Sequence, residues 1–329
     1  MSSRRALIAA ALFVCALLAG CGGGDDEEAD NPAPPVAKPE DFPRAAGKTL
    51  AELRKGLGPG GPVLAPSVSQ LTTGQNRFGF GLFDRSRAQI ADASVAVYVA
   101  PAGGGEAKGP YPARFESLAV RPQFQSRQTA TDPDSAKSVY VARIPFDTPG
   151  EYEVLGITRL DDRLVAATSA VASLPVLDVS ADTIPREGDK APRIHTQTEA
   201  DVGGDIASID TRIPPSSMHS SDFADVLGKK PAVLVFATPA LCQSRVCGPV
   251  VDIAESVKAS KEGEGVEFIH QEVFVDNRID KGLRPQLTEF NLQTEPWLFA
   301  VDRSGKVAAR LEGAFSEREL VDAIRRAKD

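Results

Sequence analysis

The chain has 329 residues, of which 42% are hydrophobic and 25% charged, and this composition excludes a disordered or collagen-like protein. The formal net charge of −8 argues against a nucleic-acid-binding surface. Because the length exceeds what one hydrophobic core usually spans, we expect two folded domains. The cysteines stand at Cys15, Cys21, Cys242 and Cys247, so a framework of many disulfides is excluded.

The first 20 residues have the pattern of an export signal. Two arginines precede an uncharged apolar run of about 15 residues, shorter than the ~20 residues of a membrane span. The run ends in Leu18-Ala19-Gly20-Cys21, which resembles the lipobox of bacterial lipoproteins. That resemblance implies that residues 1–20 are removed and that Cys21 is acylated and anchored in a lipid membrane of the bacterial cell envelope. The alternative is an ordinary cleaved signal in which Cys21 has no role.

Residues 21–45 are expected to form a tether. They begin with glycines and an acidic run and continue into a proline-rich stretch, so they cannot bury apolar area and should stay extended and solvated. The tether would hold the folded part of the chain away from the membrane. That part would then lie outside the cytoplasm, where a disulfide can persist.

Residues 46–183 are predicted to form an all-β domain. Short alternating strands separated by Gly and Pro, such as residues 95–99, are typical of a β-sandwich. The turn Pro149-Gly150 followed by Tyr152 resembles the tyrosine corner of immunoglobulin-like sandwiches, in which the tyrosine hydroxyl returns to the turn backbone. Residues 62–177 contain no His, Met or Cys, which argues against a copper site. We interpret this immunoglobulin-like domain as a spacer or docking module, with substrate binding as the alternative.

Residues 184–329 show an alternating strand and helix pattern. A near-continuous apolar strand at residues 230–238 is typical of a strand that is buried on both faces of an α/β sheet. The next predicted elements are a helix to about residue 261, a strand at 266–274, a helix at 284–290, strands at 297–302 and 306–311, and a last helix. Ser316 and Glu319 form a capping box at the start of that helix.

Three motifs in this region are similar to thioredoxin-like proteins, especially their membrane-anchored, extracytoplasmic branch. They are Cys247-Gly248-Pro249-Val250 after the buried strand, Thr294-Glu295-Pro296 before the final hairpin, and Ser304-Gly305-Lys306-Val307 within it. The resemblance covers about residues 188–329 and implies an α/β thioredoxin-like fold after the sandwich. The chain departs from the usual Trp-Cys-Gly-Pro-Cys motif, because no Trp precedes, Val250 replaces the second Cys, and Cys242 lies five residues upstream of Cys247.

The two remaining cysteines are the candidate catalytic residues. Because Pro249 is tolerated only in the first turn of a helix, the helix should begin near Cys247. The helix dipole and free N–H groups would then stabilise a thiolate at Cys247, with Cys242 near enough to resolve a mixed disulfide. The resemblance further implies that Pro296 is a cis-proline beside the pair and that the backbone of Glu295 pairs with a substrate peptide.

The sequence therefore predicts a lipid-anchored, extracytoplasmic protein that exchanges disulfides with protein thiols or disulfides, without a cofactor or a resident metal. One alternative is a non-catalytic binding lipoprotein in which Cys242 and Cys247 form a structural disulfide. Another is a Cu(I)-binding metallochaperone, since thioredoxin-like copper chaperones also place two cysteines before a helix. Such chaperones add a downstream His, whereas the histidines here are His195, His219 and His270, and none follows Pro296.

Overall fold

The computed structural model describes residues 36–329, so the predicted signal peptide and most of the tether lie outside the described residues. Among the described helices, none has the length and apolar character needed to cross a membrane. The end of the predicted tether is packed rather than solvated. Ala37 and Phe42 are buried, and the hydroxyl of Tyr98 donates to the carbonyl of Pro43 at 2.6 Å. The folded part of the chain therefore begins within the segment predicted as tether.

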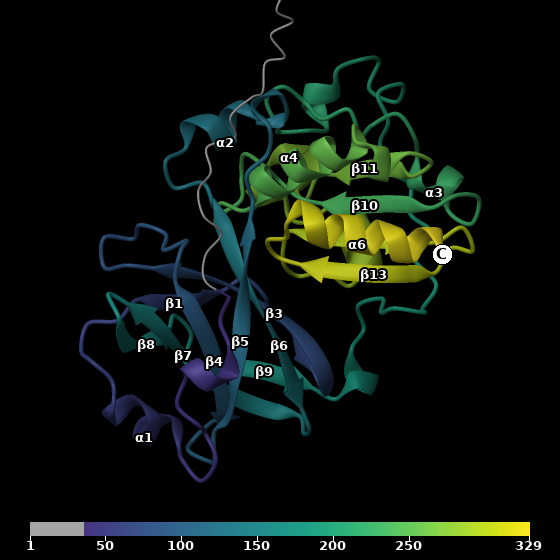
Figure 1. Cartoon of the computed structure of the whole chain (residues 1–329). Helices are drawn as coiled ribbons and strands as arrows, with labels where there is room; N and C mark the ends of the chain where they lie inside the picture. The colour runs from purple at the N-terminus through teal and green to yellow at the C-terminus, as the bar shows by residue number, and fades with distance from the viewer. Residues whose placement is uncertain (1–35) are drawn as a thin grey trace, which may run out of the picture. The chain divides into compact units, whose positions relative to one another are not determined.

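The first sheet has nine strands, which run in the order β2-β9-β7-β4-β5-β6-β3-β1-β8, and β8 also pairs with β7. Because β8 pairs with both β1 and β7, the seven strands β7, β4, β5, β6, β3, β1 and β8 close into a barrel (Figure 1). The β1–β8 pair is parallel, whereas β7 and β8 are antiparallel. The strands are β1 (Val63–Pro66), β2 (Leu71–Thr72), β3 (Gly74–Phe83), β4 (Ser94–Pro101), β5 (Lys108–Ser117), β6 (Ser138–Phe146), β7 (Gly150–Leu160), β8 (Arg163–Ser169) and β9 (Leu174–Leu177).

This barrel shows that the predicted fold class, an all-β immunoglobulin-like sandwich followed by an α/β thioredoxin-like fold, is wrong. The predicted alternation is present, since Phe78 and Phe80 of β3 are fully buried. However, a sandwich and a barrel both bury one face of each strand, so alternation does not distinguish them. Closure depends on the pairing of Val63 with Thr168, which no local sequence pattern reveals.

The predicted tyrosine corner is nevertheless present. The hydroxyl of Tyr152 donates to the carbonyl of Thr148 at 2.9 Å, across the turn that opens β7. The motif occurs here on a barrel strand. It therefore reports a local turn and does not specify a sandwich.

The second sheet has four strands in the order β11-β10-β12-β13. Strand β10 is parallel to β11, and the pairs β10–β12 and β12–β13 are antiparallel. All five residues of β10 are buried, as its continuous apolar pattern predicts. The strands are β10 (Ala232–Phe236), β11 (Glu267–Gln271), β12 (Trp297–Val301) and β13 (Val307–Glu312).

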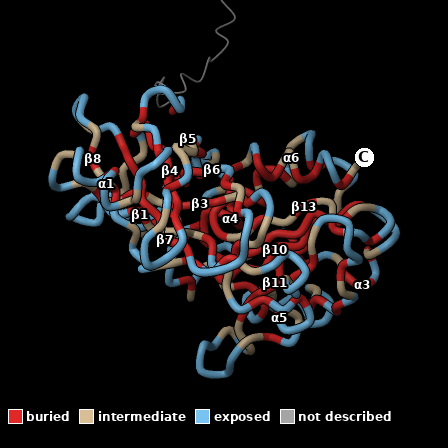
Figure 2. Tube along the Cα trace, turned by 90° about the horizontal axis from the view of Figure 1, so that it is seen from below, coloured by how far each residue is buried: buried red, intermediate tan, exposed pale blue. Residues whose placement is uncertain are grey.

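Helices cover both faces of the second sheet. Helices α4 and α6 pack through Ile253 and Ile324 in one core cluster, and α3 and α5 pack through Phe223 and Leu287 in another. In Figure 2 the strands between them appear largely as buried residues. The α-helices in the described part of the chain are α1 (Leu50–Lys55), α2 (Arg127–Thr131), α3 (Phe223–Val226), α4 (Cys247–Lys258), α5 (Pro285–Glu289) and α6 (Glu317–Lys328). Ser316 and the N3 glutamate form the predicted capping box of α6.

The barrel and the second sheet share buried contacts. Leu118, which directly follows β5, and Val141 of β6 belong to the same core cluster as the inner face of α4. Arg77 of β3 forms an ion pair with Glu319 of α6 at 2.7 Å, with both side chains less than one-tenth exposed. The division of the chain into separable domains at residues 183 and 184 stays a prediction.

Candidate active site

The two cysteines flank the start of α4. Cys242 lies in the loop after β10, and Cys247 is the first residue of the helix, as the position of Pro249 predicts. The backbone N–H of Cys247 donates to the sulfur of Cys242 at 3.4 Å. The two sulfur atoms and a carboxylate oxygen of Glu295 lie within 4.8 Å of one another, and both cysteines are free thiols. The loop thus folds back, and its movement could close the pair into a disulfide.

The local backbone explains why Cys242 reaches the helix end. Arg245 has a φ of 60°, in the left-handed region, and this turns the chain just before α4. The N-cap residue Val246 supplies no side-chain hydrogen bond to the first N–H groups. Helix N-terminal N–H groups need acceptors, and a side chain usually provides one. Here the sulfur of Cys242 is the acceptor for the N–H group of Cys247.

Cys242 is the more acidic of the two thiols. A hydrogen bond from the thiol of Cys247, followed by one from Ser244, lowers the pKa of Cys242 to about 6. The hydroxyl of Ser244 lies 3.3 Å from the Cys242 sulfur. Cys247 is completely buried, and this burial raises its pKa well above the usual value. The order of acidity is therefore the reverse of the one expected from the position of Cys247 at the helix start.

Glu295 and Pro296 complete the site. The peptide bond between them is cis, as the resemblance implies. The sequence assigns a role only to the backbone of Glu295, but its carboxyl group lies beside both sulfurs. Burial, followed by the negative charge of Cys242, raises the pKa of Glu295 to about 7. The site therefore holds a carboxyl group that can accept or release a proton near neutral pH. Pairing of the Glu295 backbone with a peptide stays a prediction.

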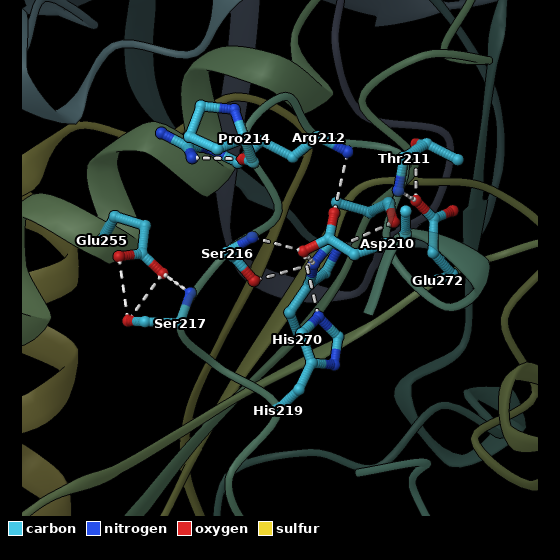
Figure 3. Close-up of polar contacts among 12 residues, drawn as sticks. Asp210, Thr211, Arg212, Pro214, Ser216, Ser217, His219, Glu255, His270 and Glu272 are labelled. Carbon is cyan, nitrogen blue, oxygen red and sulfur yellow. Dashed lines mark hydrogen bonds and ion pairs between the residues drawn. The ribbon is translucent and has the colours of Figure 1, made fainter. Parts of the chain in front are cut away.

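Asp210, His219 and His270 form a buried His–Asp cluster (Figure 3). Nε2 of His270 lies 3.0 Å from the carbonyl of Ala237, the residue that follows β10. Because a carbonyl only accepts, this Nε2 carries a proton. His219 contacts the Asp210 carboxylate through its Nε2 at 3.0 Å. The cluster therefore holds the backbone at the start of the cysteine loop.

The second ring nitrogen of His270 determines the charge of the cluster. Its Nδ1 lies 3.2 Å from the Asp210 carboxylate, and a lone pair there would face a negative oxygen. A proton on Nδ1 removes this repulsion, so the cluster contains an imidazolium and a carboxylate. Burial alone lowers the pKa of His270, but the charge of Asp210 overcomes it and raises the pKa to about 9. In Asp210 the two histidines outweigh burial and bring the pKa far below its usual value.

Among residues 36–329, two groups of side chains have the spacing to hold a metal ion. In the His–Asp cluster, the protonated ring of His270 already balances the negative charge of the Asp210 carboxylate. The other group consists of Cys242, Cys247 and Glu295, and no histidine joins it among residues 36–329. Cu(I) favours soft sulfur ligands over a carboxylate. The histidine that a thioredoxin-like copper chaperone would add is therefore missing from the described site.

The connection between β5 and β6 covers the cysteine loop. We call this segment, residues 118–137, the cap; it contains α2. The backbone N–H of Ser126 donates to the Asp252 carboxylate of α4 at 3.0 Å. Asp132 forms an ion pair with Arg245 of the cysteine loop at 2.5 Å. Sequence reasoning missed the cap, since more than a hundred residues separate each pair of partners and no local pattern joins them.

The remaining predicted site residue, Cys21, lies outside the described residues. The side chains that sequence reasoning missed are the Glu295 carboxyl group and the His–Asp cluster. The available signal is a single histidine, His270, in a strand whose residues are mostly buried, and this signal does not identify the partner of the histidine.

Comparisons with known proteins found matches among solved structures. No protein-family model matches the chain. A search of curated proteins also found no match. Among solved structures, a thiol:disulfide interchange protein of the thioredoxin family from Chlorobium tepidum TLS is similar at 16% sequence identity and a TM-score of 0.30. The match covers 45% of this chain and 99% of that one.

Proposed function

We propose that the chain is a thiol–disulfide exchange protein in which Cys242 is the nucleophile and Cys247 the resolving cysteine. One observation carries this proposal: a sulfur of lowered pKa at the start of α4, with a second, buried thiol and a carboxyl group beside it. A thiolate is the attacking form in disulfide exchange, and a pKa near ambient pH suits it. A purely structural pair needs neither the acidic thiol nor the adjacent carboxyl group.

In the reaction, the Cys242 thiolate attacks one sulfur of a substrate disulfide. A mixed disulfide forms, and the other substrate sulfur leaves as a thiolate that takes up a proton. Cys247 then loses its proton to the Glu295 carboxylate, and its sulfur attacks that of Cys242. The second substrate thiol leaves, and the protein holds a Cys242–Cys247 disulfide. One substrate disulfide is reduced to two thiols while the protein dithiol is oxidised, and the reverse sequence oxidises a substrate dithiol.

We further propose that the protein works outside the cytoplasm, held at a lipid membrane by acylated Cys21. The support is the N-terminal pattern of two arginines, an apolar run and Leu18-Ala19-Gly20-Cys21. Labelling cells with a palmitate analogue should mark the wild-type chain. A Cys21→Ser variant should lose the label, and retention of the label in that variant would contradict the anchor.

The reduction potential separates exchange from the structural alternative. The full chain is equilibrated in dithiol–disulfide buffers, and the free thiols are trapped and counted. Because a stabilised thiolate favours the reduced form, we expect a potential less negative than about −300 mV, together with turnover of a disulfide substrate. A potential below about −300 mV with no turnover would support a structural disulfide and overturn the proposal.

A further inference from the structure

Cys242 opens into a cavity of about 740 Å³ between the cap and the cysteine loop. In Figure 1, α2 of the cap lies beside α4. The cavity is lined by Gln128, Thr131 and Asp132 on the cap side and by Ala240, Cys242 and Arg245 on the loop side. Cys247 is not part of the lining. A substrate that enters this cavity therefore meets the more acidic thiol first.

Buried contacts fix the cap in place. The Asp252 carboxylate, which accepts from Ser126, is also paired with Arg212 at 2.9 Å, and both charged side chains are almost fully buried. Arg212 also donates to the carbonyl of Phe124 in the cap at 2.7 Å, so moving the cap away would take hydrogen-bond partners from two buried charged groups, which is costly. The cap also touches the first turn of α4, because a Cβ on Gly248 would lie only 2.8 Å from the hydroxyl of Thr129. The cap is therefore not easily displaced by an approaching protein.

The barrel also flanks the cis-proline end of the site. The backbone N–H of Ser69, between β1 and β2, donates to the Glu312 carboxylate at 2.8 Å. A Cβ on Gly313 would lie 1.9 Å from the carbonyl oxygen of Ser67, so the two backbones are in close contact. The N–H of Gly313 donates to the carbonyl of Pro296 at 2.9 Å. Segments of the barrel thus lie near both ends of the cysteine site, which restricts the approach of a folded partner.

From this geometry we propose that the substrate is a low-molecular-weight disulfide with charged amino-acid ends, of the class of cystine, bound in the cavity beside Cys242. This proposal rests on the exchange function and narrows its substrate class. The cavity has the size of a small-molecule site. The ion pair of Asp132 and Arg245 offers opposite charges to the ammonium and carboxylate groups of such a substrate. In the reaction, one molecule of disulfide becomes two thiols as the Cys242–Cys247 disulfide forms.

The test measures single-turnover oxidation of the reduced full chain by L-cystine. An Ala240→Phe variant fills the cavity from an exposed position of the loop, and Thr131→Trp fills it from the cap. We expect each variant to lower the second-order rate constant at least tenfold. Ala172→Phe, at an exposed position of the barrel outside the cavity, is the matched control and should change it less than twofold. Alkylation by iodoacetamide after unfolding should confirm that the thiol of Cys242 remains intact in every variant.

A disulfide in an unfolded protein serves as the competing substrate. We expect the wild-type chain to react faster with L-cystine than with this protein. If the protein disulfide oxidises the pair rapidly and L-cystine does not, or if Ala240→Phe and Thr131→Trp leave the cystine rate unchanged, the small-substrate proposal is overturned while exchange survives. If neither disulfide oxidises the wild-type pair, the exchange function itself fails.

Discussion

The backbone N–H of Cys247 donates to the sulfur of Cys242 at 3.4 Å, so the first turn of α4 stabilises charge on a residue that precedes the helix. In an ordinary helix start, a side-chain oxygen would accept this type of bond. Here the acceptor is the sulfur that lines the cavity, while the sulfur on the helix itself is fully buried. This division is the basis on which we propose Cys242 as the attacking thiol and Cys247 as the resolving one.

The first prediction concerns the pH dependence of alkylation. Because the pKa of Cys242 is lowered to about 6, its thiolate predominates above that pH and is lost below it. We expect the rate of iodoacetamide alkylation at Cys242 to rise with pH and to reach half its maximum near pH 6. Peptide mass mapping after short exposures between pH 5 and pH 9 measures it. A midpoint near the ordinary cysteine value of about 8.5, or faster labelling of Cys247, would contradict the assignment.

The second prediction concerns the Glu295 carboxyl group. A Glu295→Gln variant cannot accept the proton of Cys247, so we expect resolution of the mixed disulfide to slow by on the order of 10²-fold. Attack by Cys242 should not slow, because it needs no proton acceptor at pH 7. Rapid acid quenching and mass analysis follow both steps in one reaction. Glu289→Gln, at an exposed position of α5, is the control, and equal rates in the two variants would remove Glu295 from the mechanism.

The third prediction concerns the contact that seats the cap. Replacing Asp252 by Ala leaves the buried Arg212 without its partner, and removing one member of a buried pair typically costs about 3–5 kcal/mol. We expect a loss of that size in the free energy of unfolding measured with urea. Asp322→Ala breaks an exposed ion pair with Arg325 instead, and it should cost about 0–1 kcal/mol. Equal losses in the two variants would show that the buried Asp252–Arg212 pair, against which the cap packs, contributes no more to stability than an exposed pair.

The fourth prediction concerns the His–Asp cluster. The pKa of His270 is raised to about 9 in the folded protein, above its usual value near 6.5. The stability that this shift contributes is fully present below pH 6.5 and is lost as the pH rises through 9. We therefore expect the stability difference between the protein and its His270→Gln variant to shrink from pH 6 to pH 9. Both chains should carry Cys242→Ser, so that thiol titration does not contribute. A constant difference would show that His270 is neutral.

The sequence predicts those features of the fold that depend on local chemistry. The strand pattern of β10, the start of α4 at Cys247 and the capping box of α6 all follow from neighbouring residues. Closure of the barrel does not, because it depends on the pairing of β1 with β8, about one hundred residues apart in the chain. A turn motif such as the one at Tyr152 is compatible with a sandwich and with a barrel.

In the candidate site, too, the sequence predicts the local features but not the contacts between distant residues. The spacing of the cysteines and the position of Pro249 predict that Cys242 and Cys247 meet at a helix start. How deeply each sulfur is buried depends on packing against the rest of the fold, so the sequence does not reveal that the pKa of Cys242 is the lower of the two. The Glu295 carboxyl group, the cap and the His–Asp cluster bring together residues from distant parts of the chain.

Trapping of the mixed disulfide tests the central claim most directly. The full chain with Cys247→Ser, and separately with Cys242→Ser, is mixed with L-cystine or with an unfolded protein disulfide and then analysed by intact mass and peptide mapping. We predict that the Cys247→Ser chain accumulates a mixed disulfide on Cys242 with at least one of the two substrates, and that the Cys242→Ser chain accumulates none. Accumulation on Cys247 in the Cys242→Ser chain, or no adduct in either chain, would contradict exchange through Cys242.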